Sequence, residues 1–157
     1  HVPSLGRMHR IEERVRVELP GMSVPVVGRI DWLSEDDNAM WLVDAKTARS
    51  TFNEDKLREV TPQLALYASA YTPLAAFLGK PLRGRLVIFR KLKKARIEIV
   101  DVELAAADLN RTEQMLRETW ALIEAAHTAD SFPVRQSWVC RQCVFQSRCQ
   151  RECTTTD

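Results

Sequence analysis

The sequence has 157 residues, 45% of them hydrophobic, and its 23 Lys and Arg residues against 21 Asp and Glu residues give a formal net charge of +2. A chain of this length can bury one real core, so we expect a single soluble domain. Its apolar runs are too short to cross a bilayer, which excludes an integral membrane protein, and no secretory signal is visible. The small net charge does not indicate nucleic-acid binding by the whole chain, so such a surface would need a local cluster of Lys and Arg.

The first ten residues show no clear hydrophobic period, and the chain starts at His1 without a methionine. We therefore expect a fragment or a processed product. The stretch Glu12–Leu19 then alternates in hydrophobicity, which predicts a strand whose apolar residues share one side with Glu13. The pair Pro20-Gly21 predicts the turn that ends this strand.

Two strand-like stretches, Val26–Leu33 and Met40–Ala48, flank the polar cluster Ser34–Asn38. Turn-forming side chains between two such stretches predict a β-hairpin. Side chains alternate along a strand, so every second residue of each stretch faces the same side of the hairpin.

On this hairpin Asp31, Asp44 and Lys46 would converge on one point. Unpaired charge beside apolar residues is strongly disfavoured unless a cation compensates it. Hard divalent cations such as Mg²⁺ or Mn²⁺ take oxygen ligands, usually one or two carboxylates, with water and substrate phosphate in the other positions. We expect Asp31, Asp44 and the Ala45 carbonyl as ligands, with Lys46 beside a metal-bound water or a phosphate. The implied chemistry is phosphodiester hydrolysis, although Asp-X-Lys is also a common tripeptide in a chain with 28% charged residues.

Polar residues at 49–60 predict a loop, and Thr61-Pro62 then predicts the N-cap and first residue of a helix. Gln63 and Tyr67 stand four residues apart and therefore share a face of this helix. Pro73 should kink or stop the helix. Either both polar side chains reach the metal site or a phosphate, or the Tyr packs in the core and the Gln is a polar residue of the first turn.

Three motifs now stand in order: GRID at 28–31, DAKT at 44–47 and QLALY at 63–67. Their combination resembles the RecB-type branch of the PD-(D/E)XK nuclease superfamily, where the pattern reads Gly-X-X-Asp, Asp/Glu-X-Lys and Gln-X-X-X-Tyr. The resemblance runs from about Glu12 to the end of the chain. By this resemblance the site consists of two metal ligands, a catalytic lysine and two supporting residues: Asp31 and Asp44, Lys46, and Gln63 and Tyr67.

The resemblance implies an α/β, restriction-endonuclease-like core at residues 1–134, with a mixed central sheet flanked by helices and a Cys-rich tail at 135–157. Family members usually carry helices before the first strand, with an acidic residue or His near the metal. We expect these helices to be missing here, so that Glu13 or Glu12 either supplies this carboxylate or faces solvent.

The same resemblance implies a metal-dependent deoxyribonuclease, most often an exonuclease, that acts on single-stranded DNA or free ends. Such enzymes work in DNA repair, recombination, or phage or CRISPR-type DNA processing, beside helicases or other DNA-processing proteins and without a membrane. We expect a cytoplasmic location and a bacterial, archaeal or phage gene. A non-catalytic DNA-binding module and a zinc-bearing interaction domain remain as alternatives.

A second hairpin is predicted by the alternating stretches Leu82–Lys91 and Ala95–Glu103. Its basic connection could hold a DNA backbone, because Lys and Arg contacts to phosphate supply most sequence-independent affinity. A solvated hairpin tip would look the same. The residues concerned are Arg90, Lys91, Lys93 and Lys94, with Arg96 beyond them.

A clear helix follows at Asp108–Ala129, with an apolar stripe that should pack on the sheet and His127 near its end. Four cysteines then lie within fourteen residues, the first two as Cys-X-X-Cys. This spacing indicates a metal site, either a 4Fe-4S cluster, as the tails of RecB-like nucleases suggest, or zinc. The expected ligands are Cys140, Cys143 and Cys149, with Cys153 or an upstream cysteine as the fourth.

Overall fold

The computed structural model describes residues 6–49, 52–131 and 137–149. The chain forms two compact units, residues 1–117 and 118–157, which we describe separately. The first unit contains, in chain order, β1 (Arg7–Ile11), β2 (Arg14–Val17), β3 (Val26–Arg29), β4 (Trp32–Glu35), β5 (Met40–Ala48), α1 (Glu54–Phe77), β6 (Leu82–Arg90), β7 (Arg96–Val102) and the beginning of α2 (Ala106–Thr128).

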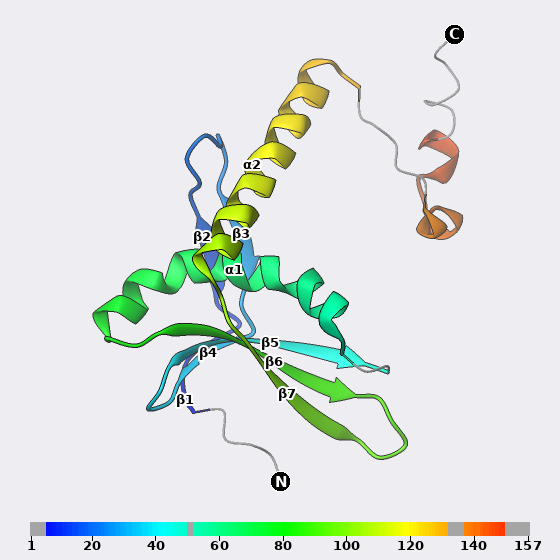
Figure 1. Cartoon of the computed structure of the whole chain (residues 1–157). Coiled ribbons are helices and arrows are strands. Elements are labelled where there is room, and N and C mark those ends of the chain that lie inside the picture. The colour runs from blue at the N-terminus through cyan, green and yellow to red at the C-terminus, as the bar shows by residue number, and fades with distance from the viewer. Residues whose placement is uncertain (1–5, 50–51, 132–136, 150–157) are drawn as a thin grey trace. The chain divides into compact units, whose positions relative to one another are not determined.

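Five strands form a mixed central sheet in the order β1-β4-β5-β6-β7, while β2 and β3 pair in a separate two-stranded sheet (Figure 1). Only β5 and β6 run parallel among the described strand pairs, and α1 is the crossover that connects them. The expected α/β fold with a mixed central sheet and flanking helices is confirmed.

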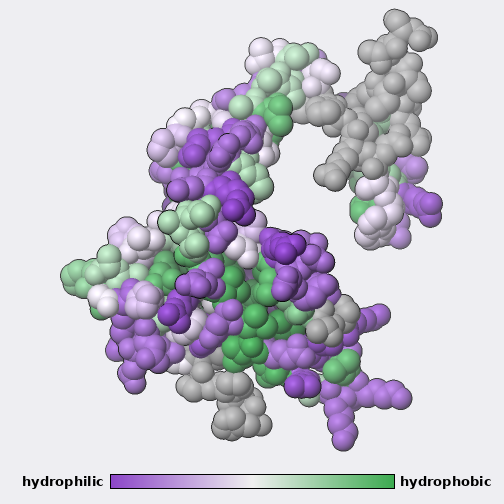
Figure 2. Space-filling model, in the orientation of Figure 1, coloured by the Kyte–Doolittle hydropathy of each residue, from purple (hydrophilic) through white to green (hydrophobic). Residues whose placement is uncertain are grey.

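The alternation of β5 divides its side chains between two apolar clusters. Leu42 lies with Leu64 of α1 and Leu86 of β6 in the main core, whereas Trp41 and Val43 belong to a smaller cluster. Residues two apart share a face of a strand, so Asp44 and Lys46 continue the Leu42 row, on the side that α1 covers. Figure 2 shows part of this apolar interior between hydrophilic side chains of the first unit.

The expected strand Val26–Leu33 is wrong as a single strand. The ladder breaks at Ile30-Asp31, where β3 leaves to pair with β2 and β4 pairs with β5. The expected loop Ser34–Asn38 also begins too early, since Ser34 belongs to β4. Two backbone amides, Asn38 N at 2.9 Å and Ala39 N at 3.0 Å, donate to Asp36, as does Trp41 Nε1 at 2.8 Å. These bonds stabilise a loop that is shorter than the predicted one.

The predicted start of the first helix is also wrong. The N-cap of α1 is Asn53, whose side chain accepts a hydrogen bond from Lys56 N at 3.2 Å. Thr61 instead lies inside the helix, where its Oγ1 donates to Leu57 O at 2.8 Å. Both prolines of the segment are tolerated inside α1, because the helix buries a row of side chains that includes Leu64 and Tyr67.

The other expectations are largely met. The hairpin of β6 and β7 forms as predicted, and α2 differs from the predicted helix by one or two residues at each end. The predicted packing of its apolar stripe is met only in the first part of the helix, where Leu109 and Leu116 pack against the main core beside the buried Thr112, whereas Ile123 is 45% exposed. The strand β1 was not predicted, because its residues Arg7–Ile11 are mostly exposed and show no hydrophobic period. In the described part of the chain, no helix is long and apolar enough to cross a membrane.

Candidate active site

Asp31 and Asp44 lie opposite each other at the end of the β4–β5 ladder. The antiparallel register pairs Trp32 with Val43, and one further step brings the two aspartates across from each other, on the same face of the sheet. Asp31 Oδ2 accepts a hydrogen bond from Ala45 N at 2.6 Å. Asp31 lies in the break between β3 and β4, and this bond holds its side chain against β5.

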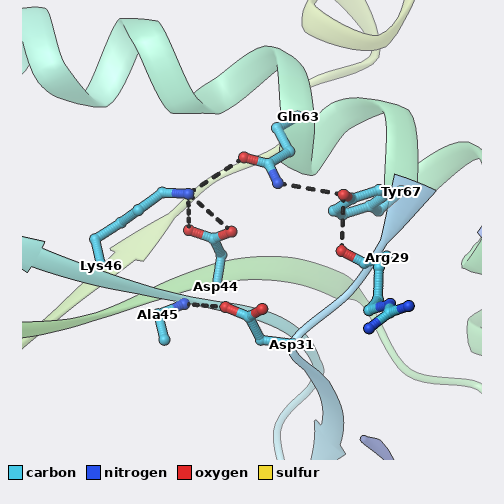
Figure 3. Close-up of polar contacts among 7 residues, drawn as sticks. All are labelled: Arg29, Asp31, Asp44, Ala45, Lys46, Gln63 and Tyr67. Atoms are coloured by element: carbon cyan, nitrogen blue, oxygen red, sulfur yellow. Dashed lines mark hydrogen bonds and ion pairs between the residues drawn. The ribbon is translucent and has the colours of Figure 1, made fainter. Parts of the chain in front are cut away.

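Lys46 is two residues beyond Asp44 on β5, and their side chains meet (Figure 3). Lys46 Nζ donates to Asp44 Oδ1 at 3.1 Å and lies 2.8 Å from Oδ2. The Asp44 residue is only 5% exposed. Burial raises the pKa of the Asp44 carboxyl, Lys46 acts to lower it, and the charge of Asp31 adds to the rise. The carboxylate is thus a group that a further cation would stabilise.

A chain of hydrogen bonds runs from Lys46 through two side chains of α1 to the backbone of β3 (Figure 3). Tyr67 OH donates to Arg29 O at 2.9 Å, and Gln63 Nε2 donates to Tyr67 OH at 3.2 Å. The amide oxygen of Gln63 therefore faces Lys46 Nζ, at 3.4 Å. The two residues that the sequence placed on one helix face both reach the site.

Gly28 makes room for this arrangement. A Cβ at position 28 would lie 2.6 Å from Tyr67 Cε1 and 2.9 Å from Tyr67 OH, closer than real Cβ contacts come. The sequence motifs did not predict this role, nor that of the Arg29 carbonyl. The available signal was a glycine inside a strand, which often marks the close approach of another group.

The residues at this site fit a hard divalent cation. Asp44 Oδ2 is buried and outside hydrogen-bond geometry, despite its short distance to Lys46. In a strand the N–H and C=O of one residue point to the same side, so the Ala45 carbonyl faces the side on which Ala45 N meets Asp31. Across the described residues, no three His, Cys, Asp or Glu side chains form a metal-binding group. The protein could therefore offer two carboxylates and a carbonyl, and leave other positions to water and phosphate.

The structure does not bring Glu13 to the two aspartates. Tyr71 OH donates to Glu13 Oε2 at 2.6 Å, and Arg10 Nε lies 3.3 Å from Glu13 Oε1. Burial and the bond to Glu13 raise the pKa of Tyr71. Glu12 is exposed and lies 3.5 Å from Arg29.

The basic residues of the β6–β7 hairpin differ in what they contact. The Arg90 side chain is 9% exposed, and its Nη1 lies 3.1 Å from Glu98 Oε2. Lys91, Lys93 and Lys94 are exposed, and Figure 2 shows hydrophilic side chains that project from this tip.

In the second unit, none of Cys140, Cys143 and Cys149 forms a disulfide bond. Cys140 lies in a short 3-10 helix, Trp138–Gln142, and its Sγ accepts a hydrogen bond from Ser137 N at 3.3 Å. The expected fourth ligand, Cys153, lies outside the described residues. The structure does not gather the three described thiols into one metal-binding group.

Comparisons with known proteins agree with this fold. The protein SSO0001 superposes with a TM-score of 0.55 at 19% sequence identity, over 90% of this chain and 60% of that one. A protein from Eubacterium rectale described as a "Putative exonuclease" gives a TM-score of 0.55 at 14% identity, over 94% of this chain and 57% of that one. This chain thus spans about three fifths of the length of these two structures.

No curated protein matches the chain. The family model of the PD-(D/E)XK nuclease superfamily matches residues 3–150, almost the whole sequence. The match includes Asp31, the strand β5 that carries Asp44, and the helix that carries Gln63 and Tyr67. The chain belongs to the PD-(D/E)XK nuclease superfamily.

Proposed function

We propose that this protein is a divalent-metal-dependent deoxyribonuclease of the RecB-like branch, and that it works from DNA ends as an exonuclease. The observation that carries the proposal is the meeting of Asp31, Asp44 and Lys46 on one face of the sheet, with Lys46 anchored by Gln63. Membership of the nuclease superfamily and the likeness to a protein described as a "Putative exonuclease" support it.

Each residue of the site has a separate role in this proposal. Asp31, Asp44 and the Ala45 carbonyl bind Mg²⁺ or Mn²⁺. The bound ion would make a water molecule more acidic and offset charge on the phosphate. Lys46 stabilises the negative charge that grows on the phosphate in the transition state. Gln63 keeps the ammonium group in place when Asp44 is engaged elsewhere.

The substrate backbone would continue from this site toward the β6–β7 hairpin. Asp44 pairs in register with Leu86, and Lys91 follows five residues later along the same strand direction. At roughly 3.3 Å per residue this is a separation of about 17 Å. Lys91, Lys93 and Lys94 would therefore hold DNA a few nucleotides from the cut. The Arg90 guanidinium is engaged with Glu98, so its contribution would be to support the hairpin.

For the tail we propose a structural 4Fe-4S cluster, with zinc as the alternative. The absence of a disulfide bond at Cys140 and Cys143 supports this proposal, because thiols that form no disulfide remain available as ligands. Cys153 or a cysteine outside this sequence would complete the set. A helicase or another DNA-processing protein, in repair, recombination or CRISPR-type processing, would be the partner.

Two substitutions test the active site by their different effects. Asp44→Asn removes a charge from the ion's ligands, so metal affinity and cleavage should fall together, and excess Mn²⁺ should restore part of the rate. Lys46→Ala should leave metal affinity unchanged or higher and lower cleavage about a hundred- to a thousandfold, without rescue by metal. Calorimetric metal titration beside cleavage of single- and double-stranded DNA measures both.

Three results would contradict the proposal in different ways. Wild-type protein that binds DNA but neither binds a divalent ion nor cleaves DNA would identify a non-catalytic module. Wild-type protein that does none of these would refute the nuclease assignment. Normal cleavage by Lys46→Ala would refute the role of the lysine alone.

A further inference from the structure

Two arginines face each other across the β2–β3 ribbon. The register pairs Arg14 directly with Arg29, and both are exposed. Like charges directly opposite on neighbouring strands destabilise a sheet. Such a pair therefore favours an anion between or beside the two guanidinium groups.

Nearby acids compensate this pair poorly. Arg29 Nη1 lies 3.5 Å from Glu12, in an ion pair whose two side chains are 68% and 61% exposed. Arg14 makes no ion pair within the described ranges 6–49, 52–131 and 137–149. The neighbouring Arg16, in contrast, lies 2.8 Å from Glu18. From position 7 to position 29 the chain has five arginines and three glutamates, a local excess of positive charge.

The backbone connects this pair directly to the candidate active site. Glu12 N donates to Asp31 O at 2.8 Å, and Ile30 N donates to Glu13 O at 3.0 Å, so the ribbon's pairing continues as far as Asp31. Each arginine is two residues from this Glu12–Asp31 contact. At roughly 3.3 Å per residue, the pair is about 7 Å from Asp31 along the ribbon.

The other face of the ribbon fixes its position. Val15 and Val17 are buried in the main core, and Gly28 lies against Tyr67. Tyr67 also bonds the carbonyl of Arg29. Side chains opposite each other in a strand pair share a face, so both guanidinium groups leave the ribbon on the side away from Tyr67, toward solvent (Figure 3 draws Arg29).

We propose that Arg14 and Arg29 form a phosphate clamp that binds the substrate phosphate next to the one at the metal site. This inference rests on the proposed nuclease function and adds a binding surface to it. A planar guanidinium can give two parallel hydrogen bonds to a phosphate, which suits arginine to this role. An anion between the pair also relieves their repulsion.

Salt-dependent binding tests the clamp. The probe is a fluorescein-labelled single-stranded DNA of mixed sequence, and the full chain is titrated in EDTA, so that cleavage does not interfere. Each phosphate contact that is lost should reduce the slope of log affinity against log salt by about 0.7. Arg14→Gln and Arg29→Gln should each show this reduction. Arg16→Gln is the matched control, because it removes the same charge from the same ribbon face, and it should leave the slope unchanged.

Stability separates the clamp from damage to the fold. Because Arg14→Gln and Arg29→Gln each remove one of two facing positive charges, the melting temperature of these two variants at low salt should stay the same or rise. An unchanged slope in both clamp variants would overturn the inference, as would an equal reduction in Arg16→Gln. If the wild type still cleaves DNA in either case, only the clamp is refuted. Wild-type protein that neither binds nor cleaves DNA would refute the clamp and the proposed function together.

Discussion

Gly28→Ala probes the close packing of β3 against Tyr67 at the candidate active site. The added Cβ would lie 2.6 Å from Tyr67 Cε1 and 3.2 Å from Cζ. Gly28 is not among the glycines with positive φ, so the effect is steric and does not come from backbone strain. The Tyr67 ring is buried, and its hydroxyl is fixed by Arg29 O and Gln63. The ring must move, or β3 must move away from α1.

Either movement should lower the free energy of unfolding. Overpacking in a well-packed interior typically costs about 1–3 kcal/mol. Movement of the ring would also weaken two hydrogen bonds of Tyr67, each with a net contribution of about 0.5–1.5 kcal/mol. At roughly 4 °C per kcal/mol for a domain of this size, we expect overpacking alone to lower the melting temperature by about 4–12 °C, and the weakened hydrogen bonds to lower it further. Cleavage should fall as well, because Gln63 would no longer hold Lys46.

Thermal unfolding and DNA cleavage, measured on the same preparations, check this prediction. Gly84→Ala is the matched control, since its Cβ would lie 3.0 Å from the end of the Leu64 side chain and 3.2 Å from Val102 Cβ, and contacts no residue of the candidate active site. The control should lose some stability and keep its activity. Tyr67→Phe keeps the ring and removes the hydroxyl. It should lower cleavage without introducing a steric clash. Wild-type stability and cleavage in Gly28→Ala would refute the reasoning.

Three further predictions concern charge and metal. In EDTA, Asp44→Asn should be more stable than the wild type at neutral pH. Burial raises the pKa of Asp44, so the free energy of unfolding of the wild type falls as pH rises from the unfolded pKa of 3.8 through the higher folded pKa. A pH series of melting curves in which the two proteins do not differ would contradict this prediction. Neutralising Lys91, Lys93 and Lys94 together should weaken binding of unrelated DNA sequences equally. In anisotropy titrations, the slope of log affinity against log salt should fall by up to about 0.7 per lost contact, whereas an unchanged slope would show that these lysines face only solvent. Cys143→Ser should remove iron or zinc and lower the melting temperature, and unchanged metal content by elemental analysis would exclude Cys143 as a ligand.

The parts of the site that follow from chain periodicity could be predicted from the sequence. The alternation of a strand places Asp44 and Lys46 on one face, and the four-residue spacing of a helix does the same for Gln63 and Tyr67. These relations depend only on local backbone geometry, so tertiary contacts did not change them. The structure then brings the two pairs together through the Lys46–Gln63 contact.

The parts that depend on competition between local signals were not predictable. Thr61-Pro62 is a good helix start by itself, but Asn53 provides an earlier cap, and burial of the helix face outweighs the cost of an interior proline. The break at Ile30 has no strong sequence signal, because Ile30 is apolar and buried like a strand residue. The change of sheet depends on tertiary pairing: Ile30 N still bonds Glu13 O beside the β2–β3 ribbon, whereas Trp32 pairs with Val43 of β5.

The two proposed metal sites should differ in their importance for folding. At the active site Lys46 already lies beside Asp44, so a cation is present when the divalent ion is absent. The first unit also has a buried core of its own, with Leu33, Leu42 and Leu86 fully buried. A chelator that removes Mg²⁺ should therefore stop cleavage and leave this unit folded.

The described part of the Cys-rich segment, residues 137–149, has no comparable core. Trp138, Val144 and Phe145 are 77%, 86% and 68% exposed, and no described residue of the 3-10 helix is buried. A short segment that buries so little apolar surface cannot offset its loss of conformational entropy by hydrophobic burial. Metal binding by its thiolates would supply that free energy, as it does in small metal-stabilised domains. Removal of the tail metal should thus unfold the tail, whereas removal of the catalytic ion should affect only the chemistry.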